Sequence, residues 1–424
     1  MTVSDFNLRT ALRERWGAAL LAASIPLTLP WEALSALAVV VAAACAGVLL
    51  WRERSHWPKS DLRELLLISL CLLAPSALSA VDAVQPQTSW VWVAAAIRFP
   101  LLAAAIILIA RRPKDATVMA LAIALPIGLW LVDALVQAAS GWSLGGHADA
   151  DRLSGIFGSD DLKLGPVMAV FSPLLLVTVL QSRWRLLLAF VALAAVILLA
   201  GARAGWIGLA VAVAALAAYR WGQRPGRLLA NSLIGLLLML ALALVGYHGS
   251  ERFAERVDRT AAALQGDAVS VDHALAGRLP IFATAWRISL AHPINGIGVR
   301  GFRHAYPDYA AADDPWVNPQ THTGAAHPHH LWLEVSAEQG LVGIIGLIGA
   351  HLLLIRRWLR ASPTARKQAL GPAVALLVLM FPFNTHPALY SSFWSAVWWW
   401  LIGLFLAFSS SAQGRHELSP ASSG

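Results

Sequence analysis

The residues best suited to acid–base chemistry lie in one polar stretch in the last third of the chain, THTGAAHPHHLWLEVSAEQG. This stretch contains four histidines and two glutamates: His322, His327, His329, His330, Glu334 and Glu338. A neutral imidazole can remove a proton from a hydroxyl group near neutral pH. Counted from His330, the glutamates follow at four and eight residues, which is one face of a helix. The stretch therefore indicates a general base beside the start of a helix.

A metal site is the alternative for the same stretch. Clustered histidines together with Glu334 could bind Zn²⁺, but the spacing HxHH is not an established ligand pattern. A second acidic cluster could coordinate a divalent cation and consists of Asp149, Asp151, Asp160 and Asp161. We favour solvated polar loops in both places, and the sequence predicts no metal ligands.

Two arginines occupy positions where a cation is disfavoured. Arg203, in GARAGWIG, is the only basic residue in any of the predicted short outward loops, which basic residues avoid. Arg278, in AGRLPIF, opens a predicted helix, where a cation opposes the helix dipole. An anion bound at that helix start would remove the conflict. Anion binding is thus a hypothesis for both, with lipid headgroups as the alternative for Arg203 and a solvated loop for Arg278.

Two further charges, Arg98 and Asp133, fall in the outer halves of apolar segments. Charges inside a membrane are rare and are usually paired or functional. We favour a structural ion pair between the two residues. In the alternative, Arg98 faces a substrate.

The elements that carry these residues are predicted to be membrane-spanning helices. Of the 424 residues, 58% are hydrophobic and 13% are charged, whereas a soluble domain has roughly 25% charged residues. Apolar runs of about 20 residues recur along the chain, and inside lipid such runs must be helical. The predicted spans lie near 16–31, 33–51, 64–81, 90–110, 116–138, 164–181, 186–201, 205–219, 229–247, 333–355, 369–384 and 388–408. The sequence therefore predicts an all-α, polytopic integral membrane protein with about 12 transmembrane helices.

The basic residues fix the predicted orientation. The net charge is +8, but Lys and Arg concentrate in alternate connections between spans. This is the positive-inside pattern, and it argues against a nucleic-acid-binding surface. Both termini are predicted to be cytoplasmic. Cys45 and Cys71 lie in apolar runs, which argues against a disulfide or a thiolate metal site.

The spans divide the chain into four parts. Residues 1–247 carry transmembrane helices 1–9 with a short outward loop near 140–163. Residues 248–332 form a large outward loop, which is followed by helices 10–12 in 333–408 and a disordered cytoplasmic tail in 409–424. The large loop is predicted to be helical, with an amphipathic helix on a membrane surface or on the bundle. Its apolar stripe consists of Leu279, Phe282, Ala283, Trp286 and Leu290.

Four segments, in order along residues 150–345, resemble the O-antigen ligase superfamily. His329, Leu333 and Gly340 fall at the offsets of its pattern of His-Asn, two residues, Leu, six residues and Gly. GARAGWIG resembles its Arg-Gly-Trp segment with Ala204 interposed, and GRLPIFATAWRISLAHPINGIGVRGF resembles its Arg-to-PxxGxG segment. RLSGIFGSDDLKLG, which begins at Arg152, resembles an earlier loop. One position departs from the pattern: His330 stands where the family has Asn, which leaves open which histidine is the base, and the register favours His329.

The resemblance implies glycan transfer from a polyprenyl pyrophosphate in the periplasm, with inversion and without a metal ion or other cofactor. Arg203 and Arg278 would bind the pyrophosphate and stabilise its developing charge, with His329 as general base. The further substrate contacts expected are His330, Arg98, Arg152 and Glu334.

The expected partners follow from the same resemblance. The donor is O-antigen linked to undecaprenyl pyrophosphate, and the acceptor is the lipid A-core, in the lipid of the bacterial inner membrane. O-antigen polymerases and protein O-oligosaccharyltransferases share the architecture and remain alternatives. A transporter would place coupling charges at mid-membrane with repeat symmetry between its halves, and the sequence has neither.

Overall fold

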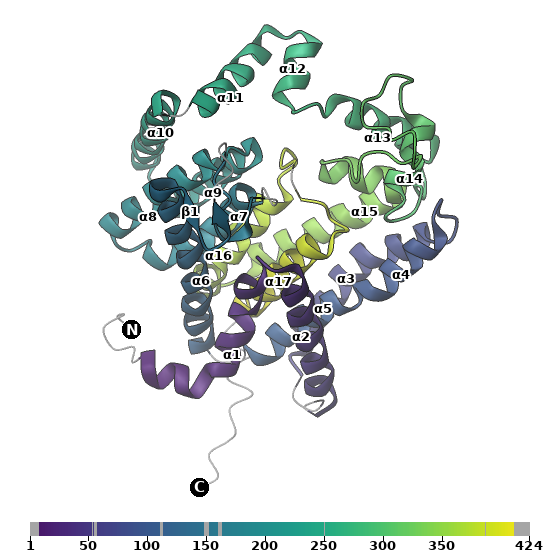
Figure 1. Cartoon of the computed structure of the whole chain (residues 1–424). Coiled ribbons are helices and arrows are strands. Elements are labelled where there is room, and N and C mark those ends of the chain that lie inside the picture. The colour runs from purple at the N-terminus through teal and green to yellow at the C-terminus, as the bar shows by residue number, and fades with distance from the viewer. Residues whose placement is uncertain are drawn as a thin grey trace.

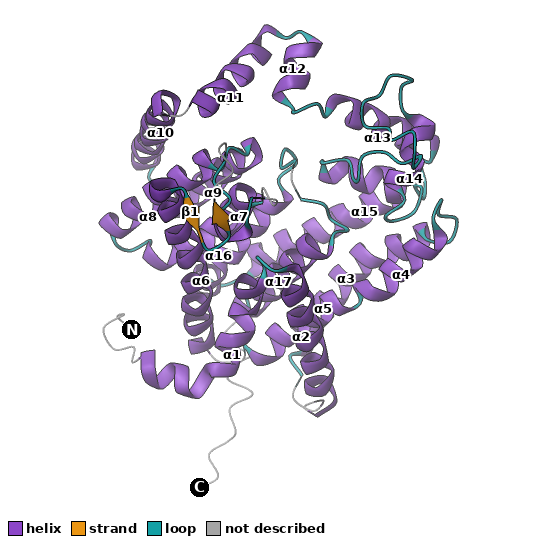
Figure 2. Cartoon of the chain, in the orientation of Figure 1, coloured by secondary structure: helices purple, strands orange, loops and turns teal. Residues whose placement is uncertain are grey.

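The computed structural model describes residues 8–52, 54, 57–110, 113–147, 152–159, 163–249, 251–385 and 387–410. Their regular secondary structure is helical, apart from one two-stranded antiparallel ribbon, β1 (Trp142–Ser143) with β2 (Gly146–His147) (Figure 2). The first helices are α1 (Leu8–Thr28), α2 (Glu32–Arg52), α3 (Lys59–Ser79), α4 (Pro86–Ala96), α5 (Arg98–Ile109), α6 (Pro113–Ser140), η3 (Gly155–Phe157), α7 (Leu164–Val179), α8 (Arg183–Leu199) and α9 (Arg203–Trp221). The remainder are α10 (Pro225–Gly249), α11 (Glu251–Ala262), η4 (Ala263–Gln265), α12 (Ala268–Ala274), α13 (Leu279–Ala291), α14 (Phe302–Tyr309), α15 (Leu331–Arg360), α16 (Pro363–Met380) and α17 (Ser392–Phe408).

A helix stands at each of the predicted spans, and the span predicted at 90–110 is divided into α4 and α5. Among the described residues, seven segments are long and apolar enough to cross a membrane: α2, α3, α4 with α5, α6, α9, α10 and α15. Others, such as α7 with 16 residues and α17 with 17, are shorter than the roughly 20 residues that a span needs. The chain is thus an all-helical, multi-pass membrane protein, and twelve as the number of spans stays a prediction.

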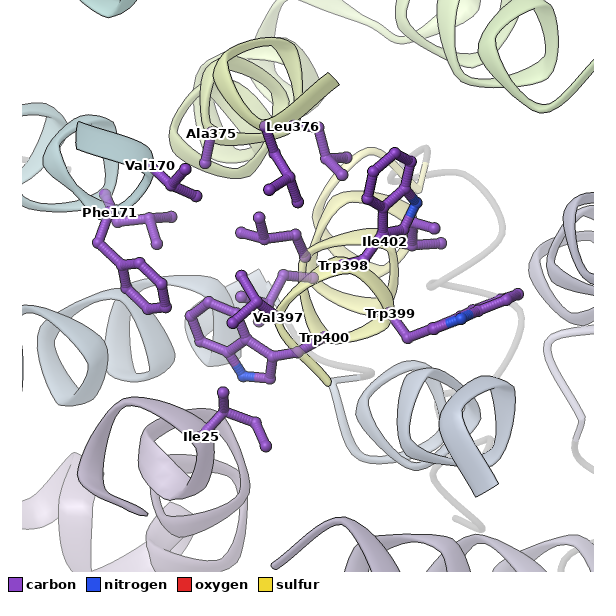
Figure 3. Packing of buried hydrophobic residues seen from close by; sticks show 14 of the residues in the cluster. Ile25, Val170, Phe171, Ala375, Leu376, Val397, Trp398, Trp399, Trp400 and Ile402 are labelled. Carbon is purple, nitrogen blue, oxygen red and sulfur yellow. The ribbon is translucent and has the colours of Figure 1, made fainter. Parts of the chain in front are cut away.

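The last helix, α17, is the centre of the bundle. Every residue from Phe393 to Phe408 is buried. Figure 3 shows Trp398 and Trp400 among residues of α1, α7 and α16. Trp400 stacks on Phe171 with 5.5 Å between the ring centroids, and its indole nitrogen donates to the Ala22 carbonyl at 3.1 Å. Close packing of this kind holds helices together where lipid provides no hydrophobic driving force.

Helix α15 bends at Gly340, where a turn from the large loop inserts. Gly340 has φ +59°, and a Cβ there would lie 2.5 Å from the Ile294 carbonyl. The backbone of the turn 293–298 takes over helix hydrogen bonds: Leu341 N donates to Pro293 O (2.8 Å), and Ile297 N donates to Ala337 O (3.1 Å). The turn therefore ties the large loop to the first turns of α15.

The predicted large loop is helical, as expected, and contains α11 to α14. In Figure 1 it runs from α10 over the upper side of the molecule to α13 and α14, beside the start of α15. One face of α13 packs against α14 and α15, with Ile281, Ala285 and Ile288 fully buried. The predicted apolar stripe lies on the other face, where Trp286 and Leu290 are 57% and 63% exposed. It therefore does not face the bundle. The predicted tail beyond residue 410 lies outside the described residues.

Candidate active site

Arg278 is held by a strained turn directly before α13. Ala276 and Gly277 both have left-handed backbone conformations, with φ +58° and +72°. The turn is fixed by Asp272 Oδ1, which accepts from Leu279 N (2.9 Å), and by the Trp316 indole, which donates to Gly277 O (2.7 Å). Arg278 is the N-cap residue of α13, as the sequence predicted.

Arg203 begins α9 and reaches the helices of the large loop. Its Nε donates to Thr260 Oγ1 at 2.8 Å, and its guanidinium also donates to the carbonyls of Arg256 and Ala274. The neighbouring Gly201 (φ +70°) leaves room for the Arg256 guanidinium, which lies where a Cβ would stand. Arg203 thus binds α11 and α12, which argues against the alternative in which it reaches lipid headgroups.

Four arginines from separate parts of the sequence come together here: Arg152, Arg203, Arg259 and Arg278. Burial lowers the pKa of Arg278, and the nearby charges of Arg152 and Arg203 lower it further. Burial and the charge of Arg259 lower the pKa of Arg152 in the same way. Arg259 pairs with Glu255 (3.1 Å) in its own helix. Cations that crowd one another in this way favour an anion with several charges, and the guanidinium fork suits phosphate oxygens.

The four histidines have different environments. His327 and His329 form a pair with 3.9 Å between their ring centroids. Burial, together with the charges of Arg278 and Arg300, lowers the pKa of His327 to about 4. His330 is the N-cap of α15, and its Nδ1 accepts from Leu333 N at 3.4 Å. His322 lies on the surface near Asp308, 3.3 Å away. Of these four histidines, His327 lies close enough to Arg278 and Arg300 for their charges to act on it, and His329 contacts His327.

The described residues contain no group of three or more His, Cys, Asp or Glu side chains placed to hold a metal ion. The four aspartates considered as a second metal site, Asp149, Asp151, Asp160 and Asp161, lie outside the described residues.

Glu334 and Glu338 lie on one face of α15, as predicted, and each is 2% exposed. Glu334 Oε2 accepts from Leu389 N (2.8 Å) in the segment between α16 and α17. Glu338 accepts from Arg300 N (2.8 Å) and Phe302 N (3.1 Å) at the start of α14. Both carboxylates hold backbone segments in place, and a substrate contact by Glu334 stays a prediction.

The segment 381–391, between α16 and α17, was missed by the sequence reasoning. The predicted spans 369–384 and 388–408 left almost no connection there, but α16 ends at Met380 and α17 begins at Ser392. This segment meets two of the predicted substrate contacts, and the first residue of α17 meets a third. Thr385 accepts from Arg278 (3.1 Å), Leu389 donates to Glu334, and Ser392, just beyond it, accepts from Arg98 (3.2 Å). The available signal was PFNTHP, in which polar residues stand between prolines within an apolar region.

Arg300 was also missed. It has a left-handed backbone (φ +66°) between Gly298 and Gly301, and its positive charge acts on His327. A side chain other than glycine in this region is uncommon, and such strained residues gather at functional sites. The signal in the sequence was an arginine inside the glycine-rich GIGVRGF.

The prediction of an Arg98–Asp133 ion pair was wrong. Arg98 lies at the start of α5, donates to Ser392 Oγ and stands 4.8 Å from the centroid of the Phe99 ring. Asp133 instead accepts from Leu144 N at 2.7 Å, beside the ribbon of β1 and β2. The donor to Asp133 Oδ1 is thus the backbone of that ribbon's turn and not Arg98. Arg98 therefore contacts the start of α17, next to segment 381–391.

Together these features define a class of protein: a multi-pass helical membrane protein in which arginines gather around a histidine pair at one end of the bundle. Residues 187–348 match the family model described as O-antigen ligase, which confirms the resemblance to that superfamily. The matched range includes Arg203, Arg278 and His329, whereas Arg98, Arg152 and segment 381–391 lie outside it. No curated protein matches the chain.

Proposed function

We propose that the protein is a glycosyltransferase that ligates O-antigen polysaccharide from undecaprenyl pyrophosphate to the lipid A-core. The reaction would occur on the periplasmic face of the bacterial inner membrane. The observation that carries the proposal is the gathering of Arg152 and Arg203 near Arg278, whose charge also acts on His327 of the His327–His329 pair.

The arginines suit the donor. The leaving group is a pyrophosphate, which gains negative charge as the bond to the anomeric carbon breaks. Arg278 and Arg203 present planar forks that can bind its oxygens in a bidentate manner. Charge stabilisation by groups already in position is usually the largest contribution to catalysis of this kind. Relief of the repulsion among the arginines adds to the affinity for such an anion.

His329 is the proposed general base. An acceptor hydroxyl oxygen attacks the anomeric carbon from the side opposite the pyrophosphate, its proton passes to the imidazole, and the configuration inverts. His329 has a left-handed backbone with φ +52°, a strain that surrounding contacts must maintain. His330 supports this register, because its Nδ1 caps α15, and Asn, the residue of the family pattern, is among the best N-caps.

Deletion of the gene followed by electrophoresis of the lipopolysaccharide tests the proposed acceptor. We expect loss of long O-chains with the core intact, while O-chains linked to the polyprenyl carrier persist. Short chains on the lipid A-core would instead indicate a polymerase. Normal lipopolysaccharide together with the loss of glycan from a pilin-like protein would indicate an oligosaccharyltransferase.

Complementation then connects the phenotype to the site. The wild-type gene should restore long O-chains, and His329→Ala should not, at equal abundance in the membrane. Thr364→Ala, an exposed change in the first turn of α16, is the matched control and should restore them fully.

A further inference from the structure

Helix α13 has one apolar face that the fold leaves uncovered. Trp286 and Leu290 on α13, and Ile294 three residues beyond its end at Ala291, follow one another at intervals of four residues and are 57%, 63% and 69% exposed. We call these three residues the outer stripe. The opposite face of α13 is already packed, with Ile281, Ala285 and Ile288 fully buried against α14 and α15. The helix is therefore apolar on two faces, and packing of the loop accounts for only one of them.

The outer stripe continues onto the surface of two candidate membrane spans. Asn295, next to Ile294, donates to Leu78 O (3.0 Å) and to Asp82 Oδ1 (2.6 Å) at the turn between α3 and α4. Val84 N, in the same turn, donates to Ile297 O at 2.9 Å. α3, and α4 together with α5, are both long and apolar enough to cross a membrane. These bonds hold the end of the stripe level with the ends of those spans.

The surface around that junction is also apolar. Val81 and Val84, in the α3–α4 turn, are 70% and 44% exposed, and Val91 on α4 is 63% exposed. In Figure 1, the turn between α3 and α4 lies on the same side of the molecule as α13 and α14. Lipid that surrounds α3 and α4 would therefore lie close to the outer stripe, with the Asn295–Asp82 contact at the junction.

We propose that α13 lies in the plane of the membrane surface, with Trp286, Leu290 and Ile294 inserted among the lipids of the leaflet on the side of the active site. An interfacial helix buries one apolar face at the boundary between headgroups and acyl chains. Tryptophan favours this depth, because its ring is apolar and its N–H remains near water. Arg287, next to Trp286, is exposed and can reach anionic headgroups.

Docking of α13 has a consequence for the site, and this step rests on the proposed function. Arg278 is the N-cap of α13, and Phe282 of the same helix stands 6.0 Å from His330 between ring centroids. A helix fixed on the lipid surface therefore fixes the height of the arginine and of the histidines above the bilayer. A pyrophosphate whose polyprenyl tail stays in the lipid would be presented at that height.

Depth measurement by fluorescence tests the docking without any assay of activity. Single cysteines replace Trp286, Leu290 or Ile294 in full-length protein that carries Cys45→Ala and Cys71→Ala, and each is labelled with an environment-sensitive dye. The protein is placed in lipid nanodiscs of phosphatidylethanolamine and phosphatidylglycerol, with or without lipids that carry a quencher in the acyl chain. Leu264, which is 89% exposed in η4, is the matched control.

We expect quenching by the lipid-borne quencher at all three stripe positions, and quenching by aqueous iodide at position 264 alone. Equal access of iodide to the stripe and to position 264 would overturn the proposal. Protection of the stripe that requires two copies per nanodisc, without lipid quenching, would also overturn it and would indicate an interface between copies.

A functional comparison separates this inference from the proposed reaction. Leu290→Lys should reduce transfer to an acceptor embedded in lipid at least tenfold more than transfer to the same core sugar in soluble form. Leu264→Lys should change neither rate. Lipid quenching with no transfer to either acceptor would support the docking and reject the proposed reaction. Equal effects of Leu290→Lys on both acceptors would reject its link to the site.

Discussion

The four histidines in residues 322–330 have different environments because their neighbours differ. His330 Nδ1 caps α15, and the His322 ring lies near Asp308 on the surface. His329 lies against His327, whose pKa is lowered by burial and by two arginines, so His327 stays neutral at physiological pH. Because His327 is neutral, its ring places no positive charge beside His329. These differences favour His329 as the candidate base and His330 as a structural histidine.

Replacement of His329 should abolish most of the transfer. We expect His329→Ala to leave donor binding intact and to lower the transfer rate by roughly two to four orders of magnitude, the range for loss of a general base. His330→Asn should retain substantial activity, because the amide oxygen of Asn can cap α15. Initial rates with purified protein and lipid-linked donor measure both. An active His329→Ala beside an inactive His330→Asn would transfer the base role to His330.

The arginines should not tolerate exchange for lysine. Lysine keeps the charge but loses the planar fork. We therefore expect Arg278→Lys to lower kcat/KM for the donor nearly as much as Arg278→Ala, and the same at Arg203, whose fork also binds Thr260 and the loop backbone. Arg227→Lys, an exposed change near the start of α10, is the matched control. Near-normal rates for both lysine variants would show that charge alone suffices.

Stability should fall with pH in the window set by His327. The ordinary pKa of histidine is 6.5, whereas burial and two arginines lower the pKa of His327 in the folded protein to about 4. Between these values the unfolded chain binds more protons than the folded one, so the free energy of unfolding decreases as pH falls from about 6.5 to about 4. Thermal unfolding in detergent at several pH values should show a shallower decrease for His327→Gln. Identical slopes for variant and wild type would contradict the assignment.

Individual helices are set by local patterns, whereas the links between them are set by distant segments. The hydrophobic runs predicted the helix places well, and the glycine-rich PINGIG predicted a break after α13. The sequence alone could not reveal that this break inserts into α15 at Gly340. It also missed segment 381–391, because two apolar runs flank it closely.

The Gly340 bend should be intolerant of any side chain. Its φ of +59° and ψ of −152° are almost restricted to glycine, and a Cβ would meet the Ile294 carbonyl. We expect Gly340→Ala to destabilise the protein by about 1–3 kcal/mol and to loosen the large loop. Thermal unfolding and limited proteolysis measure these effects. Gly235→Ala on α10, where nothing lies within 4 Å, should be neutral. Equal stability of the two variants would contradict the role of the bend.

The molecule has two polar ends, one near the start of α15 and one near its end. The arginines and histidines stand at the start of α15, whereas Arg357, near its end, pairs with Asp61 (2.7 Å) and Glu64 (2.8 Å) of α3. The part of α15 after the bend, residues 341–360, covers about 30 Å, the thickness of the hydrocarbon core of a bilayer. The predicted orientation puts the first end outside and the second in the cytoplasm.

Labelling of two matched threonines tests that orientation. Thr321→Cys lies in the large loop and Thr364→Cys in the first turn of α16, both exposed, in protein without Cys45 and Cys71. In spheroplasts, a membrane-impermeant maleimide should label position 321 at once and position 364 only after the inner membrane is permeabilised. The opposite order would invert the predicted topology.

By itself, the sequence determined the helical class, the places of the helices, and the spacing of His329 to Gly340. These depend on hydrophobic runs and on short-range register, which a single stretch of chain contains. Only the tertiary structure decided that Arg203 binds α11 and α12, that His330 caps α15 while His329 pairs with His327, and that Arg98 meets Ser392 instead of Asp133. The outcomes for Arg203 and Arg98 depend on which polar group a distant segment brings within hydrogen-bonding distance, whereas the His330 cap and the His327–His329 ring contact are local. Burial makes such pairing obligatory, but it leaves the choice of partner to the packing of the whole chain.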